Sequence, residues 1–498
     1  MYIFLRNNDY RYAAEQMLLM LFPEERPVYP SADPGLREEN AVELELKHGK
    51  TYTTAVCRLR YDRRTAQKHV RARTDGIRAG EERARIEQRI LKLAFYRAAL
   101  DVGVPKPEWG CLTGVRPAKF LAGLMQKDGL TETAAVRMLT ETFGVSKERA
   151  SLALAAERAA ARAKAVLAPQ DVCLYIGIPF CPTRCAYCSF VSVDAPKLLK
   201  SIPDYLNALE QEMRSTAAAV KAAGRRIVAV YIGGGTPTTL LAPELDRLLA
   251  DTKACFDLSA CREFTVEAGR PDTVTEEKLA VLVSHGVNRV SVNPQTMSDA
   301  VLEEIGRHHT AAQVREAVAM VKKFPQLAFN MDLIAGLPGD TPESFSDTVR
   351  KVIALGAENI TVHTLALKKG SRFLTEGTAL PDGKAVGEML GDAREKLEAA
   401  GYAPYYLYRQ KFMSGSFENV GWTKPGYENL YNICIMEELC GILAVGAGGS
   451  TKLTAPGGVV KRLMAPKYPR EYMDRIAHTC AEKDEIVRFY NSEPKGTN

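Results

Sequence analysis

The sequence lacks the long apolar segments that would place it in a membrane or export it. No run of about eighteen or more uncharged apolar residues occurs, so no membrane-spanning helix is predicted. The first residues, MYIFLRNNDYRY, have neither the basic start nor the apolar stretch and small-residue cleavage site of a secretory signal. We therefore expect a cytoplasmic protein. Its 46% hydrophobic and 25% charged residues suffice for large folded cores.

The sequence has few residues that could serve as the fourth ligand of a zinc site. The chain has seven histidines, and none lies close in sequence to its one dense group of thiols, Cys181, Cys185 and Cys188, spaced C-x3-C-x2-C. Structural zinc usually takes four closed ligands, and an electron-transfer ferredoxin cluster takes four thiolates at other spacings. Disulfides are not expected in a large chain that is not exported. Apolar neighbours indicate core packing for five other cysteines: Cys57, Cys173, Cys255, Cys261 and Cys440.

The 498 residues exceed the size of one domain, and three regions are predicted. Residues 1–165 are expected to form an α+β accessory domain without a constellation of catalytic residues. Its strands are expected at 1–7, 41–48 and 51–61, and its helices at 81–100 and 146–167. Residues 381–498, with a helix at 386–400, are expected to form a mostly helical C-terminal domain.

Residues 166–380 alternate between short apolar strands and helical stretches. Six strands are expected, at 172–178, 226–234, 263–268, 289–293, 327–336 and 358–367. A capping box of Thr273 and Glu276, and an N-cap at Thr341 followed by Pro342, predict two of the helix starts. This alternation favours an α/β fold with a parallel sheet, either doubly wound or curled into a partial barrel.

The three clustered cysteines lie where α/β folds place their chemistry. They follow directly on the C-terminal end of the first strand of the alternating region. An iron–sulfur cubane held by three thiolates would keep one iron open. That iron could chelate an amino and a carboxylate group, such as the methionine end of S-adenosylmethionine. Polar signatures follow the other strands too: GGGTPT at 233–238, whose glycines let backbone amides approach a ligand, and Glu267, Gln295, Arg307 and Asp332.

These motifs resemble the radical S-adenosylmethionine enzymes. The cysteine triplet with Tyr187 inside it, the GGGTPT run, DLIAGLPGDT at 332–341 and GAGGS at 446–450 occur in the family's order. Within the family, the chain is similar to the oxygen-independent coproporphyrinogen III dehydrogenase group, which includes related heme chaperones. The match runs from about 172 to 450, and CLTGVRPAK at 111–119 resembles the longer, HemZ-type members. The resemblance implies a partial (β/α)6 TIM-like barrel.

The resemblance also implies roles for individual residues. Cys181, Cys185 and Cys188 would ligate a [4Fe–4S] cluster whose open iron binds S-adenosylmethionine. The residues implied to contact that molecule are Tyr175, Gly234, Gly235, Thr236 and Glu267. In decarboxylating members a second S-adenosylmethionine is held by residues that match Tyr187, Gln295, Arg307, Asp332 and Ala366.

The implied activity is the oxidative decarboxylation of coproporphyrinogen III to protoporphyrinogen IX in heme biosynthesis, with electrons from a low-potential donor such as flavodoxin or ferredoxin. The basic residues considered for the substrate's four carboxylates are Arg270, Lys368, Lys369, Arg409 and Lys411. A heme-binding chaperone on the same barrel is the alternative, because Ser189 and Phe190 stand where decarboxylating members carry a further cysteine. The histidines considered as its iron ligand are His308, His309 and His363.

An RNA-modifying enzyme is a third hypothesis, and it depends on residues 58–89. This stretch has eleven Lys and Arg against five Asp and Glu, which could be an electrostatic footprint for RNA. A basic amphipathic surface is commoner than an RNA site, and the net charge of +6 is a small excess for this length. Nucleic acid is therefore the less favoured partner.

Overall fold

The computed structural model describes residues 1–29, 40–77, 80–127, 129–188, 200–366, 371–410, 414–455 and 459–492. These residues form two compact units, 1–154 and 155–498. The predicted domain limits at 165 and 380 fall at the last residue of α5 (Lys147–Ala165) and just before α14 (Gly383–Ala399). None of the helices in the described ranges is long and apolar enough to cross a membrane.

The first unit contains a four-stranded sheet in the order β1-β2-β3-β4, with bounds Tyr2–Arg6, Ala41–His48, Tyr52–Tyr61 and Arg64–Arg73. β1 is parallel to β2, and the other pairs are antiparallel. The sequence predicts the first three strands but not β4, in which Val70 alone is buried. Pairing along all of β3 holds this polar strand. The helices of this unit are α1 (Arg11–Leu21), α2 (Glu81–Asp101), α3 (Pro117–Lys127), α4 (Glu132–Arg137), a π-helical turn (Met138–Thr142) and the start of α5.

The second unit is built on an eleven-stranded sheet in the order β11-β12-β10-β9-β8-β7-β6-β5-β13-β14-β15. Its centre is the predicted alternating region, in which β5 to β10 are parallel and adjacent in chain order. Their bounds are Asp171–Ile178, Arg226–Gly234, Glu263–Glu267, Arg289–Ser291, Ala328–Ala335 and Asn359–Thr364. Most of their residues are buried and apolar, because a parallel sheet of this kind is covered on both faces.

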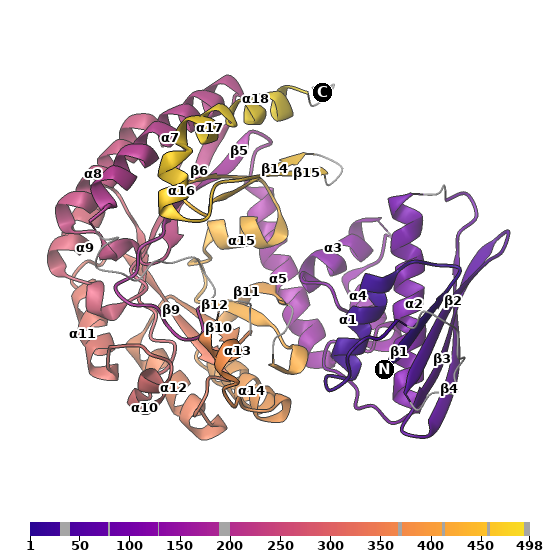
Figure 1. Cartoon of the computed structure of the whole chain (residues 1–498). Helices are drawn as coiled ribbons and strands as arrows, with labels where there is room; N and C mark the ends of the chain where they lie inside the picture. Colours follow the sequence, from indigo (N-terminus) through magenta and orange to yellow (C-terminus); the bar gives the residue numbers. More distant parts are fainter. Residues whose placement is uncertain are drawn as a thin grey trace. The chain divides into compact units, whose positions relative to one another are not determined.

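Helices connect these strands and lie in an arc around the outside of the sheet (Figure 1). They are α7 (Ile202–Ala222), α8 (Ala242–Cys255), α9 (Glu276–Ser284), α10 (Asp299–Glu304), α11 (Ala311–Val321) and α12 (Pro342–Leu355). The curved sheet with its outer helices is the partial (β/α)6 barrel that was expected, and this part of the fold prediction is confirmed.

Two helix starts test the capping predictions. Thr341 caps α12 with its side chain, and Pro342 stands in the first turn, as predicted. The predicted capping box of Thr273 and Glu276 is wrong. The chain is still in a 3-10 turn at Thr273, so α9 begins two residues later, with Thr275 as its cap.

The C-terminal region adds six helices, α13 (Arg372–Glu376), α14, α15 (Leu430–Glu437), α16 (Pro469–Asp474), α17 (Ile476–Ala481) and α18 (Asp484–Asn491), among the described residues. It also adds strands that the sequence analysis did not predict: β11 (Ala403–Tyr408), β12 (Asn419–Thr423), β13 (Gly441–Val445), β14 (Ser450–Ala455) and β15 (Val459–Met464). These strands extend both edges of the central sheet, and β13 lies parallel to β5.

Candidate active site

The C-terminal ends of the parallel strands surround a cavity of about 590 Å³. All the residues implied to hold the cluster and S-adenosylmethionine line it: Cys181, Cys185, Cys188, Tyr175, Tyr187, Gly234, Gly235, Thr236, Glu267, Gln295, Arg307, Asp332 and Ala366. They come together because parallel strands present their carboxyl ends at one edge of the sheet. Their individual roles stay predictions.

The cysteine loop follows β5 and is held on one side by the glycine run after β6. The Gly235 amide donates to the Ile178 carbonyl and the Thr236 amide to the Phe180 carbonyl, each at 2.7 Å. A Cβ on Gly235 would lie 2.5 Å from the Phe180 carbonyl oxygen, so this close approach requires glycine. These two amides therefore bind the cysteine loop, a different use from the ligand contact expected of them.

On its other side the cysteine loop is anchored through Ala186. The Ala186 amide donates to the Ile305 carbonyl at 3.0 Å, and its carbonyl accepts from the Arg372 amide at 2.9 Å. Ala186 is buried in an apolar cluster with Ile305, Leu337 and Phe373, and Tyr187 packs against the same cluster. The loop between the cysteines is thus fixed by packing as well as by hydrogen bonds.

Three stacked tyrosines and a carboxyl group form one wall of the cavity. Tyr175 and Tyr231 are neighbours in register on β5 and β6, and Tyr431 of α15 stacks on Tyr231 at 4.5 Å between ring centroids. The Tyr231 hydroxyl donates to Glu267 Oε1. Burial raises the pKa of Glu267 to about 7, against the lowering effect of this hydrogen bond. Glu267 therefore changes charge near neutral pH.

Gln295 combines backbone strain with an unsatisfied side chain. Its φ of +66° is in the left-handed region, which is uncommon outside glycine. β9 holds it there: the Gln295 amide donates to the Asp332 carbonyl at 2.9 Å, and its carbonyl accepts from the Ile334 amide at 3.0 Å. Its Oε1 is buried and has no hydrogen-bond partner within the described residues. Strain and an orphaned acceptor at a cavity wall are typical of a ligand contact.

Arg307 is a buried cation that faces the cavity. Its side chain donates to the Gly269 carbonyl at 2.7 Å and to the Tyr187 hydroxyl at 3.3 Å, while Nε has no hydrogen-bond partner in the described part of the chain. Arg307 is only 5% exposed, so it is not a surface residue paired with Glu303 or Glu304. Within the described ranges no carboxylate lies at ion-pair distance from it, and an anion from outside the chain can take that place.

Asp332 is the second carboxylate of the cavity and differs from Glu267 in protonation. Its Oδ2 lies 3.7 Å from His363 Nε2, and it accepts from Asn330 Nδ2 at 2.7 Å. Burial opposes its ionisation, but the contacts with His363 and Asn330 bring its pKa below the ordinary value. One wall therefore carries an ionised carboxylate, and another carries one that titrates near neutrality.

The basic residues considered for binding the substrate's carboxylates lie in different places and have different partners. Arg270 lines the cavity, but its guanidinium pairs with Asp272 and donates to Thr183 Oγ1 at 2.9 Å, which supports the cysteine loop. Arg409 is buried, donates to the Ser416 carbonyl at 2.7 Å, and is not among the described residues of the cavity wall. Three of the candidates lie outside the described residues: Lys368, Lys369 and Lys411.

The three histidines proposed as iron ligands are also placed differently. His308 is exposed, and His309 is buried, but neither belongs to the described wall of the cavity. Burial, together with the cations of Arg307 and Arg270, lowers the pKa of His309 to about 3, so it stays neutral. His363 does line the cavity, where it faces Asp332.

Several polar residues of the wall were not predicted from the sequence, among them Tyr231, Asn293, Asn330, Tyr406, Tyr408, Asn419, Tyr431 and Asn432. A signal existed for Tyr231, because aligning β6 with β5 places it beside Tyr175. The tyrosines and asparagines after residue 400 had no such signal, since the strands and the helix that carry them were not recognised.

The GAGGS segment at 446–450 is positioned by a buried ionic network. Glu212 on α7 accepts from the Gly446 amide at 2.7 Å and from the Tyr472 hydroxyl, and it pairs with Lys483 at 2.6 Å. The side chains of Glu212 and Lys483 are 0% and 7% exposed, so the pair is fully inside the protein. The C-terminal helices thereby hold a segment that lines the cavity.

The basic stretch 58–89 lies on β3, β4 and α2 of the first unit. Much of its charge is paired: Arg58 with Glu43, Arg73 with Asp75, Arg83 with Glu87 and Arg85 with Glu81. This pairing reduces the free positive charge that RNA binding would need.

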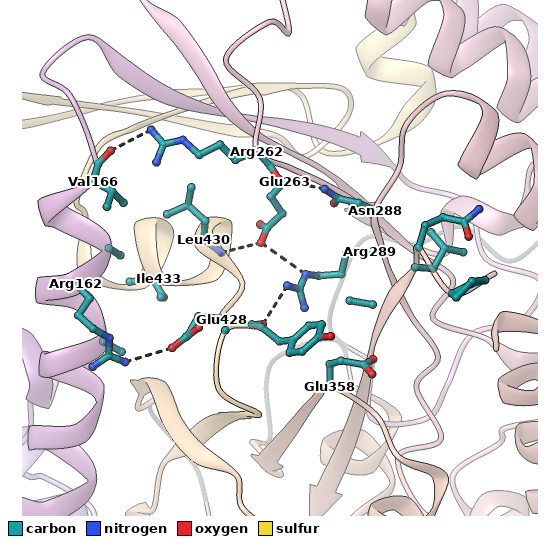
Figure 2. Close-up of a pocket in the computed structure, with 18 residues that line it drawn as sticks. Arg162, Val166, Arg262, Glu263, Asn288, Arg289, Glu358, Glu428, Leu430 and Ile433 are labelled. Atoms are coloured by element: carbon teal, nitrogen blue, oxygen red, sulfur yellow. Dashed lines mark hydrogen bonds and ion pairs between the residues drawn. The ribbon is translucent and has the colours of Figure 1, made fainter. Parts of the chain in front are cut away.

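A second cavity, of about 650 Å³, opens where the parallel strands begin (Figure 2). Three arginines and three glutamates line it: Arg162, Arg262, Arg289, Glu263, Glu358 and Glu428. Arg162 pairs with Glu428 at 3.3 Å, and Arg262 donates to the Val166 carbonyl at 3.0 Å.

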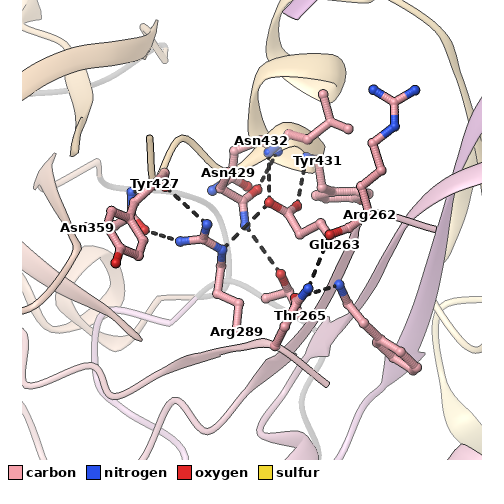
Figure 3. Close-up of polar contacts among 12 residues, drawn as sticks. Arg262, Glu263, Thr265, Arg289, Asn359, Tyr427, Asn429, Tyr431 and Asn432 are labelled. Carbon is pink, nitrogen blue, oxygen red and sulfur yellow. Dashed lines mark hydrogen bonds and ion pairs between the residues drawn. The ribbon is translucent and has the colours of Figure 1, made fainter. Parts of the chain in front are cut away.

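The inner wall of this second cavity is a network of polar contacts (Figure 3). Glu263, the first residue of β7, accepts from the first two amides of α15 at 2.9 and 3.0 Å. Arg289, the first residue of β8, lies 3.6 Å from Glu263, and it donates to Asn359 Oδ1 and to the Tyr427 carbonyl. Glu263 thereby fixes the start of α15 and has a buried cation beside it, although Arg289 Nε makes no hydrogen bond within the described residues.

Comparisons with known proteins agree with this geometry. The model of the Radical SAM superfamily matches residues 175–352. The oxygen-independent coproporphyrinogen-III oxidase-like protein HemZ of Bacillus subtilis (strain 168) is 37% identical over 382 residues, which cover 76% of this chain and 76% of that protein. Heme chaperone HemW of Escherichia coli (strain K12) is 30% identical over 302 residues, covering 60% of this chain and 75% of that one.

Among solved structures, coproporphyrinogen III oxidase (HemN) from Escherichia coli, a radical SAM enzyme, superposes with a TM-score of 0.52. The match covers 66% of this chain and 81% of that chain at 20% identity, and it supports the fold.

Radical SAM proteins use a [4Fe–4S] cluster and S-adenosylmethionine, and the residues of the cavity fit both. Three half-buried thiols on one fixed loop suit a cluster with an open iron, and the orphaned acceptor of Gln295 and the unpaired guanidinium of Arg307 suit polar ligand groups. These are the cofactors expected from the sequence. The chain belongs to the radical S-adenosylmethionine superfamily, in the group of oxygen-independent coproporphyrinogen-III oxidase-like proteins.

Proposed function

We propose that the chain catalyses the oxidative decarboxylation of coproporphyrinogen III to protoporphyrinogen IX. Each of two propionate side chains would lose one hydrogen atom, one carbon dioxide and one electron, which passes to a one-electron acceptor from outside the chain, and so become a vinyl group. When bound, the cluster supplies the electron that converts S-adenosylmethionine into methionine and a 5′-deoxyadenosyl radical, which accepts the hydrogen atom. A low-potential donor such as flavodoxin or ferredoxin would deliver electrons to the protein.

In this proposal the residues of the cavity bind and orient the reactants. Cys181, Cys185 and Cys188 would hold three irons of the cluster. The stacked tyrosines would exclude water on the side of β5 and β6, and Glu267 would accept hydrogen bonds from the ribose of S-adenosylmethionine or attract its ammonium group. The backbone of Gly234 and the side chain of Thr236 border the same space.

The observation that carries the proposal is the state of Arg307. A buried guanidinium is costly unless an anion pairs with it, and the described residues offer none. A propionate of the substrate, or the carboxylate of a second S-adenosylmethionine, would bind it in a bidentate fork. The other arginine of the cavity wall, Arg270, already has its carboxylate partner, Asp272.

A heme chaperone is the second candidate, because relatives at 30% identity or more carry that name. In this case the cavity would hold heme, and no porphyrinogen would be converted. His363 would be the accessible iron ligand, and it would have to give up its position beside Asp332.

The test is an anaerobic assay with reconstituted protein, coproporphyrinogen III, S-adenosylmethionine and a reductant, in which product is oxidised and measured as protoporphyrin. We expect turnover by the unmutated chain. Arg307→Lys should lower it at least about tenfold, or about 1.4 kcal/mol, because an ammonium group cannot replace a bidentate fork. The matched control is Arg315→Lys on the exposed face of α11, which should leave turnover unchanged.

Two results would contradict the proposal. If the unmutated protein cleaves S-adenosylmethionine but makes no product, and instead gives a heme absorbance band at one heme per chain, the chaperone is correct. If Arg307→Lys turns over like the unmutated chain, the guanidinium does not bind a reactant carboxylate.

A further inference from the structure

Three buried thiols meet beneath the cavity, outside the set that the proposed function uses. They are Cys173 of β5, Cys434 of α15 and Cys440 just before β13. Their sulfur atoms all lie within 4.8 Å of one another, and those of Cys173 and Cys440 are 3.7 Å apart. Core packing was expected for Cys173 and Cys440, and both are indeed buried in an apolar cluster, with Cys434 as a third member.

The geometry of the three sulfurs suits a single metal ion. Two sulfurs bound to one ion at about 2.3 Å, with bond angles between tetrahedral and trigonal, lie roughly 3.8 to 4.0 Å apart. The sulfur atoms of Cys173 and Cys440 are already close to that separation. Three thiols from separate parts of the chain therefore need little movement to share one ion.

The donor set and its surroundings select the kind of ion. Within the described residues no histidine, carboxylate or fourth cysteine joins the three sulfurs, whereas structural zinc takes four ligands. Thiolates also favour Cu⁺, for which three sulfurs form a complete coordination. Within the described residues the apolar cluster around them brings no carboxylate, the kind of ligand that would favour a harder ion. We propose that Cys173, Cys434 and Cys440 bind one Cu⁺ ion in a three-sulfur site beneath the floor of the cavity.

Binding would release protons and transfer no electrons. Each thiol that ligates as a thiolate gives its proton to the solvent, so affinity should fall as pH is lowered.

The position of the site links it to the cavity. β5 carries Cys173 two residues before Tyr175, on the same face of the strand, and α15 carries Cys434 one turn after Tyr431. The rings of Tyr175 and Tyr431 are 6.3 Å apart and stacked. A bound ion would tie α15 to β5 directly beneath these tyrosines and so stabilise the folded chain.

The experiment uses the full chain with Cys181, Cys185 and Cys188 changed to serine, so that the thiols of the loop cannot compete. Cu⁺ is added anaerobically against a coloured Cu⁺ chelator, and bound copper is examined by X-ray absorption. We expect one Cu⁺ per chain with three sulfur neighbours, and a rise in the unfolding temperature. A further Cys434→Ser change should weaken binding at least about 100-fold, whereas Cys57→Ser, a buried thiol of the first unit, should not change it.

The copper proposal does not depend on the porphyrinogen reaction, and different results would contradict the two proposals. Three results would each overturn it: a copper content below one Cu⁺ per chain, uptake of Zn²⁺ but not Cu⁺, and recovery of Cys173 and Cys440 as a disulfide without copper uptake. If Cys434→Ser does not fold, the X-ray spectrum of the parent decides, since fewer than three sulfur neighbours would also overturn it.

Discussion

The two ends of the barrel contain the same kinds of charged residues with different partners. Where the strands begin, Arg289 has a carboxylate, Glu263, at 3.6 Å, and Glu263 accepts from two backbone amides, although Arg289 Nε makes no hydrogen bond in the described part of the chain (Figure 3). Where the strands end, no carboxylate within the described residues lies at ion-pair distance from Arg307, Gln295 Oε1 has no hydrogen-bond partner, and burial raises the pKa of Glu267 to about 7. A buried cation without an anion marks a place where a ligand can complete the structure.

Cavity size does not distinguish the two ends. The cavity where the strands begin has a volume of about 650 Å³, and the cavity where they end has one of about 590 Å³. In the cavity where the strands begin, however, two of the three arginines pair with glutamates of the wall, and the buried Glu263 carboxylate caps a helix. The comparison therefore predicts that substitutions at the strand ends abolish chemistry and spare the fold, and that substitutions at the strand starts do the reverse.

The largest effect is expected at the cysteine loop. Cys185→Ser removes a thiolate that the cluster cannot replace, so iron content and S-adenosylmethionine cleavage should both fall to background. The loop itself is held by Ala186 and Gly235, so the unfolding temperature of the metal-free protein should change little. Iron analysis, visible absorbance and 5′-deoxyadenosine formation measure the first effect, and thermal unfolding measures the second.

The matched control is Cys255→Ser, which changes a thiol at the end of α8 away from the cavity. A brown Cys185→Ser protein with a normal iron content would show that the cysteine is not a ligand.

The next effect is a loss of stability at the other end of the barrel. Arg289→Met leaves Glu263 buried without its cation and removes donors from Asn359 and Tyr427, which should lower the free energy of unfolding by about 3 kcal/mol. S-adenosylmethionine cleavage per folded molecule should be preserved. Denaturant unfolding and activity at low temperature separate the two quantities.

The exposed neighbour Arg262 provides the control, since Arg262→Met should cost less than about 1 kcal/mol. A fully stable Arg289→Met protein with impaired cleavage would reverse the assignment of the two ends.

The sequence allowed the cavity end to be predicted more fully than the strand starts. Parallel strands bring their carboxyl ends together, so polar residues at or just after those ends had to converge, as Glu267 and Gln295 do. No comparable rule existed for Tyr431 or Cys434, because their positions depend on how α15 packs across β5 and β6. The polar strand β4 was missed for a related reason: pairing with β3 holds it, and its own side chains give almost no apolar pattern.

The smallest effect, and the most specific one, concerns the protonation of Glu267. Its folded-state pKa of about 7 is raised by burial, so the carboxyl is neutral in slightly acidic solution and ionised in slightly basic solution. The ionised form accepts hydrogen bonds from ribose hydroxyls and attracts an ammonium group, so the affinity for S-adenosylmethionine should rise as pH increases through about 7. Glu267→Gln should bind about tenfold more weakly at pH 8, or about 1.4 kcal/mol, and should lose this pH dependence.

Stability should respond with the opposite sign, which distinguishes a binding role from a structural one. Because the folded protein holds the proton of Glu267 more tightly than the unfolded chain does, the unmutated apo protein should lose stability as pH rises from the ordinary glutamate range through about 7, and the loss should level off above that pH. Glu267→Gln removes this loss, and the variant should therefore be relatively more stable at pH 8 although it binds S-adenosylmethionine less well. Calorimetric titration and thermal unfolding from pH 6 to 8 measure both. Equal pH profiles for the two proteins would mean that Glu267 does not titrate in this range, and its role at the cavity end would then be that of a neutral hydrogen-bonding group to Tyr231.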